Sequence, residues 1–239
     1  MSAIDPKLSF SHQEYCGRLE GVWAAMQRSD INLVIVTDPA NMAWITGYDG
    51  WSFYVHQCAL VPLGEDPIWY GRMQDMQGAY RRTYLAHDRV VGYEDHYVQS
   101  TQRHPMDYLA EVIGQRGYAK GPIGMELDNY FCSAASHLAM QKHLPNATIK
   151  DATYLVNWLR AVKSPAEIGY MRSAARIIEG VFERARRVMK PGMRQCGSGG
   201  RDLRRSDPRS GRALGRLYRD RSVDWRRPRC RRAAFDLDR

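Results

Sequence analysis

One stretch of the chain, residues 41–57, concentrates side chains that could bind a small molecule. It holds five aromatic residues, one His and one Asp, and two glycines interrupt it. Aromatic side chains on the rim of a loop can enclose a partly apolar or cationic ligand. The other interpretation is that Trp44, Phe53 and Val55 are core residues and that Tyr54 and His56 are ordinary partners on a strand face. Spacing alone favours this second interpretation.

Two carboxylates and several histidines could also do chemistry. Glu126 and Asp128 follow an apolar run, and alternate residues of a strand point to the same face, so they could form an acid–base pair. A solvated strand end is the favoured alternative. Four histidines have carboxylates nearby without metal-ligand spacing: His56, His87, His96 and His104. We therefore predict hydrogen-bonded structural histidines, and neither a metal site nor a cofactor in this chain.

Familiar catalytic motifs are missing from the sequence. It contains no Walker loop, no GxGxxG after a strand, no HExxH and no GxSxG, and the Gly-rich residues 196–200 lack the Lys of a phosphate loop. The five cysteines are odd in number and form no CxxC pair, which predicts reduced thiols in a cytoplasmic protein. The polar N-terminus and the lack of an apolar run of about 18 residues predict no secretory signal and no membrane partner.

The hydrophobic pattern predicts which elements position these residues. Short apolar runs indicate strands at 31–37, 53–61, 67–70, 90–93, 123–127 and 147–150. Helical spacing indicates helices at 11–27, 41–45, 74–85, 105–117, 133–143 and 152–162. This alternation predicts an α/β fold, a mixed sheet with helices on both faces.

A second domain is expected to begin after the motif Lys163-Ser164-Pro165. Ser164 suits a helix N-cap, Pro165 suits the first helical position, and Glu167 completes a capping box. The helix should run to about residue 190 with one apolar side. We predict a domain at 1–162 and the start of an incomplete second domain at 163–195.

The remaining segment, residues 196–239, differs in composition from the rest. It holds 14 Arg and no Lys, 6 Asp and no Glu, a net charge of +8, whereas the whole chain carries +9. An arginine-rich nucleic-acid-binding arm is one interpretation. The other is a frameshift, since a GC-rich gene read out of frame yields Arg, Gly, Ala, Pro and Asp. One permitted codon choice for residues 197–205, read one base later, encodes DLVAEIYD, which has a helical pattern. We favour the frameshift and expect a disordered tail.

Three segments together carry a resemblance to a known family. They are TDPANMAWITGYDGWSFYVHQ (37–57), GYEDHYVQSTQRHPMDYL (92–109) and LRAVKSPAEIGYMRSAARI (159–177). They resemble the creatinase/prolidase/aminopeptidase P family, also called the M24 or pita-bread family. The last segment is typical of that family's domain junction. The YDGWSFYVHQ motif resembles the branch that opens the cyclic amidine of ectoine, a small-molecule substrate.

The resemblance implies an N-terminal α/β domain, a C-terminal pita-bread catalytic domain and a homodimer. The general base, the carboxylates and any metal ligands belong to the C-terminal domain, so none is expected here and the chain alone should be inactive. A loop of the N-terminal domain reaches the partner subunit's active site. By this resemblance, the corresponding loop of this chain follows Gly47. Phe53 matches a position that contacts substrate in the family. The further candidates for substrate contact are Trp51, Tyr54 and His56.

Val55 stands where creatinases have an Arg for a carboxylate substrate, which argues against creatine as the substrate.

Two other functions remain open at this point. The chain could instead be a fragment of a metal-dependent Xaa-Pro peptidase of the same family. It could also be a non-enzymatic α/β module with a nucleic-acid-binding tail, which we consider less favoured.

Overall fold

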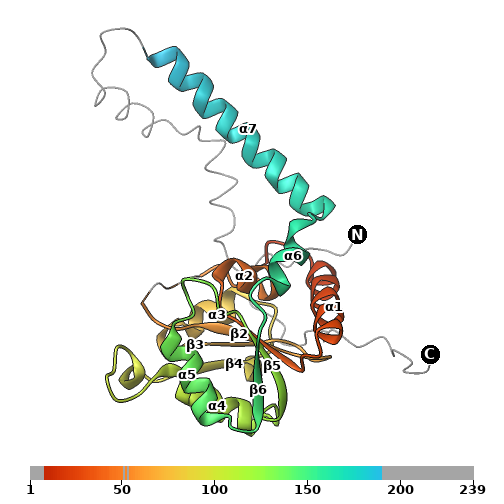
Figure 1. Cartoon of the computed structure of the whole chain (residues 1–239). Coiled ribbons are helices and arrows are strands. Elements are labelled where there is room, and N and C mark those ends of the chain that lie inside the picture. The colour runs from red at the N-terminus through yellow and green to blue at the C-terminus, as the bar shows by residue number, and fades with distance from the viewer. Residues whose placement is uncertain (1–7, 51, 53, 190–239) are drawn as a thin grey trace, which may run out of the picture. The chain divides into compact units, whose positions relative to one another are not determined.

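A six-stranded mixed sheet organises the first part of the chain (Figure 1). The computed structural model describes residues 8–50, 52 and 54–189. The strand order is β4-β3-β2-β1-β5-β6. The central strand β1 pairs antiparallel with β2 and parallel with β5. The bounds are β1 (Leu33–Val36), β2 (Cys58–Pro62), β3 (Ile68–Arg72), β4 (Val90–Tyr93), β5 (Gly121–Met125) and β6 (Ala147–Asp151).

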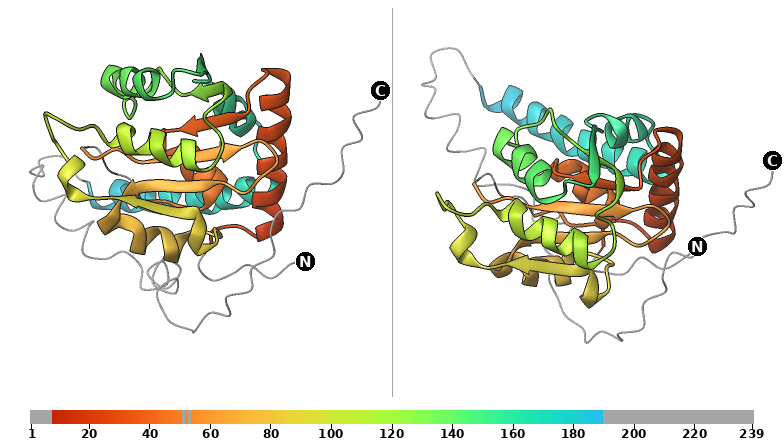
Figure 2. Two further views of the ribbon diagram at one scale, coloured as in Figure 1. Left: turned by 90° about the horizontal axis from the view of Figure 1, so that it is seen from below. Right: turned by 60° about the horizontal axis from the view of Figure 1, so that its bottom comes forward.

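Helices cover both faces of this sheet, as the alternation predicted (Figure 2). Successive residues of β1 point to opposite faces: Val34 packs in one core cluster and Ile35 in the other, and both are fully buried. One face is covered by α1 (His12–Arg28), α2 (Pro39–Thr46), α3 (Met76–Arg82) and α6 (Leu155–Ala161); the other by α4 (Pro105–Gln115) and α5 (Ala134–His143). Burying each large apolar side chain contributes roughly 1.5–3 kcal/mol.

Local capping explains where α1 begins and where α2, which leads into the candidate loop, begins and ends. Ser11 accepts a hydrogen bond from the backbone N–H of Glu14 at 3.2 Å and caps α1. Asp38 Oδ1 accepts from the N–H groups of Ala40 and Asn41, both at 2.9 Å, and caps α2. Gly47 then ends α2 with φ of +85°, a conformation that favours glycine, and the chain enters the candidate loop.

Three predicted elements differ from the observed ones by three residues or more at one end. The strand expected from residue 53 begins at Cys58, because the carbonyl of His56 accepts a hydrogen bond from Tyr93 Oη (2.7 Å) outside the strand ladder. The helix expected at 74–85 is a 3₁₀ turn, η1 (Met73–Asp75), followed by the shorter α3. The helix expected from residue 152 begins at Leu155. Two more 3₁₀ turns flank β4: η2 (His87–Arg89) and η3 (Asp95–Tyr97).

A second unit begins at Val162, after the first unit reaches Ala161. Its described part is α7 (Pro165–Val188), whose predicted capping box is confirmed: Ser164 Oγ accepts from the Glu167 N–H at 3.2 Å, and Glu167 Oε2 accepts from the Ser164 N–H at 2.8 Å. Apolar side chains of α7 are exposed, including Ile178 and Phe182. Among the described helices, none combines the length and apolarity that a membrane crossing needs. The arginine-rich tail expected at 196–239 lies outside the described residues.

Candidate functional site

The candidate loop runs from Tyr48 to Gln57, between α2 and β2, and side chains on both sides hold it. Arg82 binds the carboxylate of Asp49 through two nitrogens, with Nε 2.9 Å from Oδ1. Tyr48 is buried, with its ring centroid 5.2 Å from that of Trp69. Gln57 Nε2 donates to the carbonyl of Gly50 at 3.4 Å. The two ends of the loop are therefore fixed to the sheet and to α3.

Of the four predicted substrate-contact residues, two can be placed in the structure. Trp51 and Phe53 lie outside the described residues. Tyr54 and His56 both line a pocket of about 190 Å³. The side chain of Tyr54 is 48% exposed, so it is available at the pocket, and the favoured expectation that it belongs to a strand face is wrong.

The imidazole of His56 is half-buried and packs against a second histidine. Its ring centroid lies 4.5 Å from that of His104, at an interplanar angle of 66°. His104 Nδ1 accepts from the Met106 N–H at 3.1 Å, so the neutral His104 ring carries its proton on Nε2. Burial, and then the neighbouring His104, lower the pKa of His56 to about 4. His56 is therefore uncharged at neutral pH and offers one donor and one acceptor.

The opposite wall of this pocket comes from the segment after β5. Tyr130, Phe131 and Ser133 line it, and Tyr130 is fully exposed. Ser133 Oγ is occupied as the N-cap of α5, since it accepts from the Ser136 N–H at 3.1 Å. The described lining is thus aromatic and polar, and His56 is its one titratable group besides the tyrosines. Such a wall suits a small cationic or partly apolar ligand through aromatic faces and neutral hydrogen bonds.

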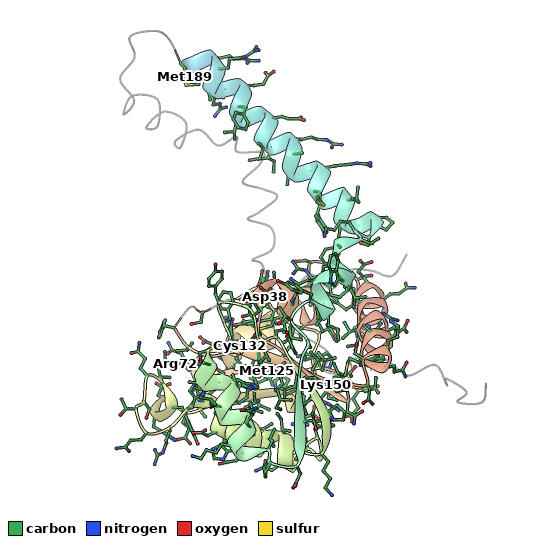
Figure 3. The ribbon with its side chains drawn as sticks, viewed as in Figure 1. Asp38, Arg72, Met125, Cys132, Lys150 and Met189 are labelled. Atoms are coloured by element: carbon green, nitrogen blue, oxygen red, sulfur yellow. The ribbon has the colours of Figure 1, made fainter. Side chains whose placement is uncertain are left out.

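A second polar cluster lies at the carboxyl end of β5, around Glu126. The side chain is 1% exposed, so the favoured expectation of a solvated strand end is wrong for this residue. Its Oε2 accepts from the N–H groups of Thr37 at 2.7 Å and Asp38 at 2.8 Å, and its Oε1 accepts from Asn41 Nδ2 at 2.6 Å. Figure 3 labels Asp38 at the start of α2, where these donors meet.

Burial and hydrogen bonding act on Glu126 in opposite directions. Burial raises the pKa of its carboxyl to about 7, although the three N–H donors favour the ionised form. Asp128 does not share this position: its backbone N–H donates to Thr153 Oγ1 at 3.0 Å and the residue is exposed, as expected for a solvated strand end. The structure therefore shows a single buried carboxylate that organises backbone, and no Glu126–Asp128 pair.

The other histidines considered in the sequence have ordinary partners. His87 stacks on Tyr80 with ring centroids 4.3 Å apart, and His96 Nδ1 lies 3.1 Å from Glu94 Oε2. Within the described part of the chain, no three His, Cys, Asp or Glu side chains group as metal ligands would.

Comparison with known proteins places this geometry in a family. The model of the creatinase/prolidase N-terminal domain matches residues 18–162. The chain belongs to this family. The creatinase/prolidase domain thus contains the whole candidate loop, the His56–His104 pair and the Glu126 cluster.

Curated relatives of this creatinase/prolidase chain include hydrolases. Ectoine hydrolase of Halomonas elongata is 48% identical over 191 residues, which cover 80% of this chain and 48% of that protein. An uncharacterized hydrolase/peptidase of Sinorhizobium fredii is 44% identical over 190 residues, covering 79% of this chain and 48% of that protein. The chain spans about half the length of the curated relatives it matches.

Solved structures confirm the fold of the family. The Xaa-Pro dipeptidase from Bacillus anthracis matches with a TM-score of 0.62 and 17% identity, over 79% of this chain and 47% of that one. A dipeptidase from Mycobacterium ulcerans matches with a TM-score of 0.61 and 18% identity, over 81% of this chain and 49% of that one. At such identities the likeness shows the fold alone.

Sequence reasoning did not single out Tyr130 or Asn41, and it named His104 without connecting it to His56. Tyr130 and His104 are far from residue 56 in the sequence, and no periodic pattern connects them. Asn41 carried a usable signal, because a buried Asn inside a short apolar helix needs partners for its amide.

Proposed function

We propose that this chain supplies the N-terminal domain of an ectoine-hydrolase-like enzyme, which opens the cyclic amidine of ectoine. The observation that carries the proposal is the 48% identity to the ectoine hydrolase of Halomonas elongata over 191 residues, 80% of this chain. The aromatic, uncharged pocket beside Tyr54 and His56 supports it, because aromatic faces attract a delocalised cation such as a protonated amidine.

The proposed reaction is a hydrolysis. Water adds to the amidine carbon of the ring, one ring C–N bond breaks, and the released nitrogen takes up a proton to give an amine. The product is an N-acetyl-diaminobutyrate. The water needs a general base, and the cationic ring needs acidic groups that hold it. We propose that these groups belong to a C-terminal domain and that the 239-residue chain alone is inactive.

The loop at residues 48–57 would act on a neighbouring subunit. We propose that the intact enzyme is a homodimer and that Trp51, Phe53, Tyr54 and His56 complete the substrate site of the partner. Two inactive full-length variants test this. One is changed in the loop (Tyr54→Ala), and in the other a catalytic residue of the C-terminal domain is replaced. Mixed dimers that regain about a quarter to half of the activity would support exchange of the loop, whereas mixtures without activity would contradict it.

The first experiment is to resequence the gene across the codons for residues 194–200. One extra base would support the frameshift, and the frame-restored enzyme should then be incubated with ectoine while N-acetyl-diaminobutyrate is followed by mass spectrometry. Xaa-Pro dipeptides with added Mn²⁺ serve as the competing substrates. Cleavage of the peptides with no turnover of ectoine would replace the proposal by a metallopeptidase function.

If the sequence stands as written, the tail at 196–239 is translated as it reads. A nucleic-acid-binding module then predicts binding that weakens steeply with salt and is lost on removal of the tail. Ectoine-binding calorimetry on the same chain separates the two functions.

A further inference from the structure

One buried side-chain amide, that of Asn41, connects the end of the sheet to the last helix of the first unit. Its Nδ2 donates to Glu126 Oε1 at 2.6 Å and to Asn157 Oδ1 at 2.8 Å. Its Oδ1 accepts from Arg160 Nη1 at 2.6 Å. Both amide hydrogens and the carbonyl oxygen of Asn41 are therefore used, and two of these three contacts reach α6.

Helix α6 is short, and it packs against α1 as well as against α2. It has seven residues, and a helix of two turns is unstable in water unless tertiary contacts hold it. Val156 is its one fully buried side chain, with Leu155 and Leu159 partly buried against the same core cluster. Trp158, between them, is 74% exposed. The polar contacts to α2 therefore add a second attachment to the apolar packing of α6 on the core and on α1.

The position of α6 matters because the chain leaves the first unit there. The helix ends at Ala161, and the second unit begins at Val162. Helix α2, which α6 contacts, ends at Gly47, where the candidate loop begins. We propose that Asn41, Asn157 and Arg160 form a linker latch, which holds α6 against α2 and so fixes the point where the chain leaves the N-terminal domain.

The electrostatics of the cluster favour this role. Glu126 orients Asn41 by accepting one amide hydrogen, which leaves the carbonyl oxygen directed to the Arg160 guanidinium. Arg160 Nη1 also lies 4.0 Å from Asp38 Oδ1, the carboxylate that caps α2. A cation on α6 thus meets an amide oxygen and a carboxylate of α2. In an enzyme built as proposed above, Asn41, Asn157 and Arg160 would be positioning residues for the linker, with no contact to substrate.

Hydrogen exchange in the 239-residue chain tests the latch. Asn157→Ala and Arg160→Met remove its two contacts on α6 and leave the buried Asn41–Glu126 pair in place. Each should raise amide exchange of residues 158–161 about tenfold, the effect of losing one hydrogen bond of ordinary strength, while exchange in α4, on the other face of the sheet, stays unchanged. A change in helix propensity would not explain faster exchange. Ala has a higher helix propensity than Asn, and Met has about the same propensity as Arg.

Two further variants complete the experiment. Arg81→Met changes an exposed arginine on α3 and should leave exchange of residues 158–161 at the wild-type rate. Arg160→Lys keeps a cationic donor and should retain most of the protection. Unchanged exchange in both latch variants would overturn the proposal, and so would an equal rise in α4, which indicates general destabilisation. No substrate is involved, so failure of the latch and failure of the ectoine proposal are distinguishable.

Discussion

The side-chain amide of Asn41 donates to the carboxylate of Glu126 at 2.6 Å, although 85 positions separate the two residues. Both side chains are buried, and the same carboxylate accepts two backbone N–H groups at the start of α2. One acidic group thereby sets the start of the helix that leads into the candidate loop.

Glu126 should make stability depend on pH in an unusual direction. Burial raises its pKa from 4.5 to about 7. The folded chain therefore binds this proton more tightly than the unfolded chain, so the stabilisation is complete below about pH 4.5 and is lost as pH rises to about 7. The loss is at most about 3 kcal/mol, from roughly 1.4 kcal/mol per pH unit.

Urea unfolding of wild type and Glu126→Gln between pH 4.5 and 7.5 measures this contribution. The glutamine does not titrate, so the stability advantage of wild type over the variant should shrink as pH rises. A difference that is constant with pH would mean that Glu126 keeps an ordinary pKa. Asp38 and Arg160, the charged groups beside it, are present in both proteins and cancel in the comparison.

His56 should have the opposite pH dependence. Its pKa falls from 6.5 to about 4, so the unfolded chain takes up this proton first. The stabilisation is present above pH 6.5 and is lost as pH falls toward 4. His56→Gln should therefore lose less stability than wild type over that interval. An NMR titration of the imidazole, in the folded chain and in urea, checks the pKa directly; equal values in the two states would contradict the prediction.

The ion pair between Arg82 and Asp49 should control the loop more than the fold. Because the pair is partly exposed, Arg82→Gln should cost only about 0.2–1 kcal/mol of stability. Chymotrypsin cleavage at the aromatic residues of the loop should nevertheless become several-fold faster. Arg81→Gln, one residue earlier and exposed, is the control and should leave cleavage unchanged. Equal cleavage in both variants would show that other contacts hold the loop.

Gly47 should tolerate no side chain. It has φ of +85°, and an added Cβ would lie 3.0 Å from the carbonyl oxygen of Arg82. Gly47→Ala should destabilise the domain by about 1–2 kcal/mol from the left-handed backbone alone. Gly114→Ala in α4 meets no atom within 4 Å and should stabilise by roughly 0.5–1 kcal/mol. Thermal unfolding of the pair tests the prediction, and a neutral Gly47→Ala would contradict it.

Short-range patterns were enough to predict much of the fold. The INLVIVT run predicted β1, because β-branched residues buried on both faces suit a central strand. The capping box at Ser164 and Glu167 predicted the start of α7 because its hydrogen bonds join residues three apart. The quoted segments also indicated the family, which the match over residues 18–162 confirmed.

The tertiary structure alone decided how the candidate site is built. No local pattern brings His104 against His56, Tyr130 to the pocket of Tyr54, or Arg160 to Asn41. The strand predicted at 53–61 begins only at Cys58, and the His56 carbonyl before it binds Tyr93, 37 positions away. The physical reason is common to all four: each contact joins residues far apart in the sequence, and proximity in the folded chain, which local sequence patterns do not specify, decides which of them meet.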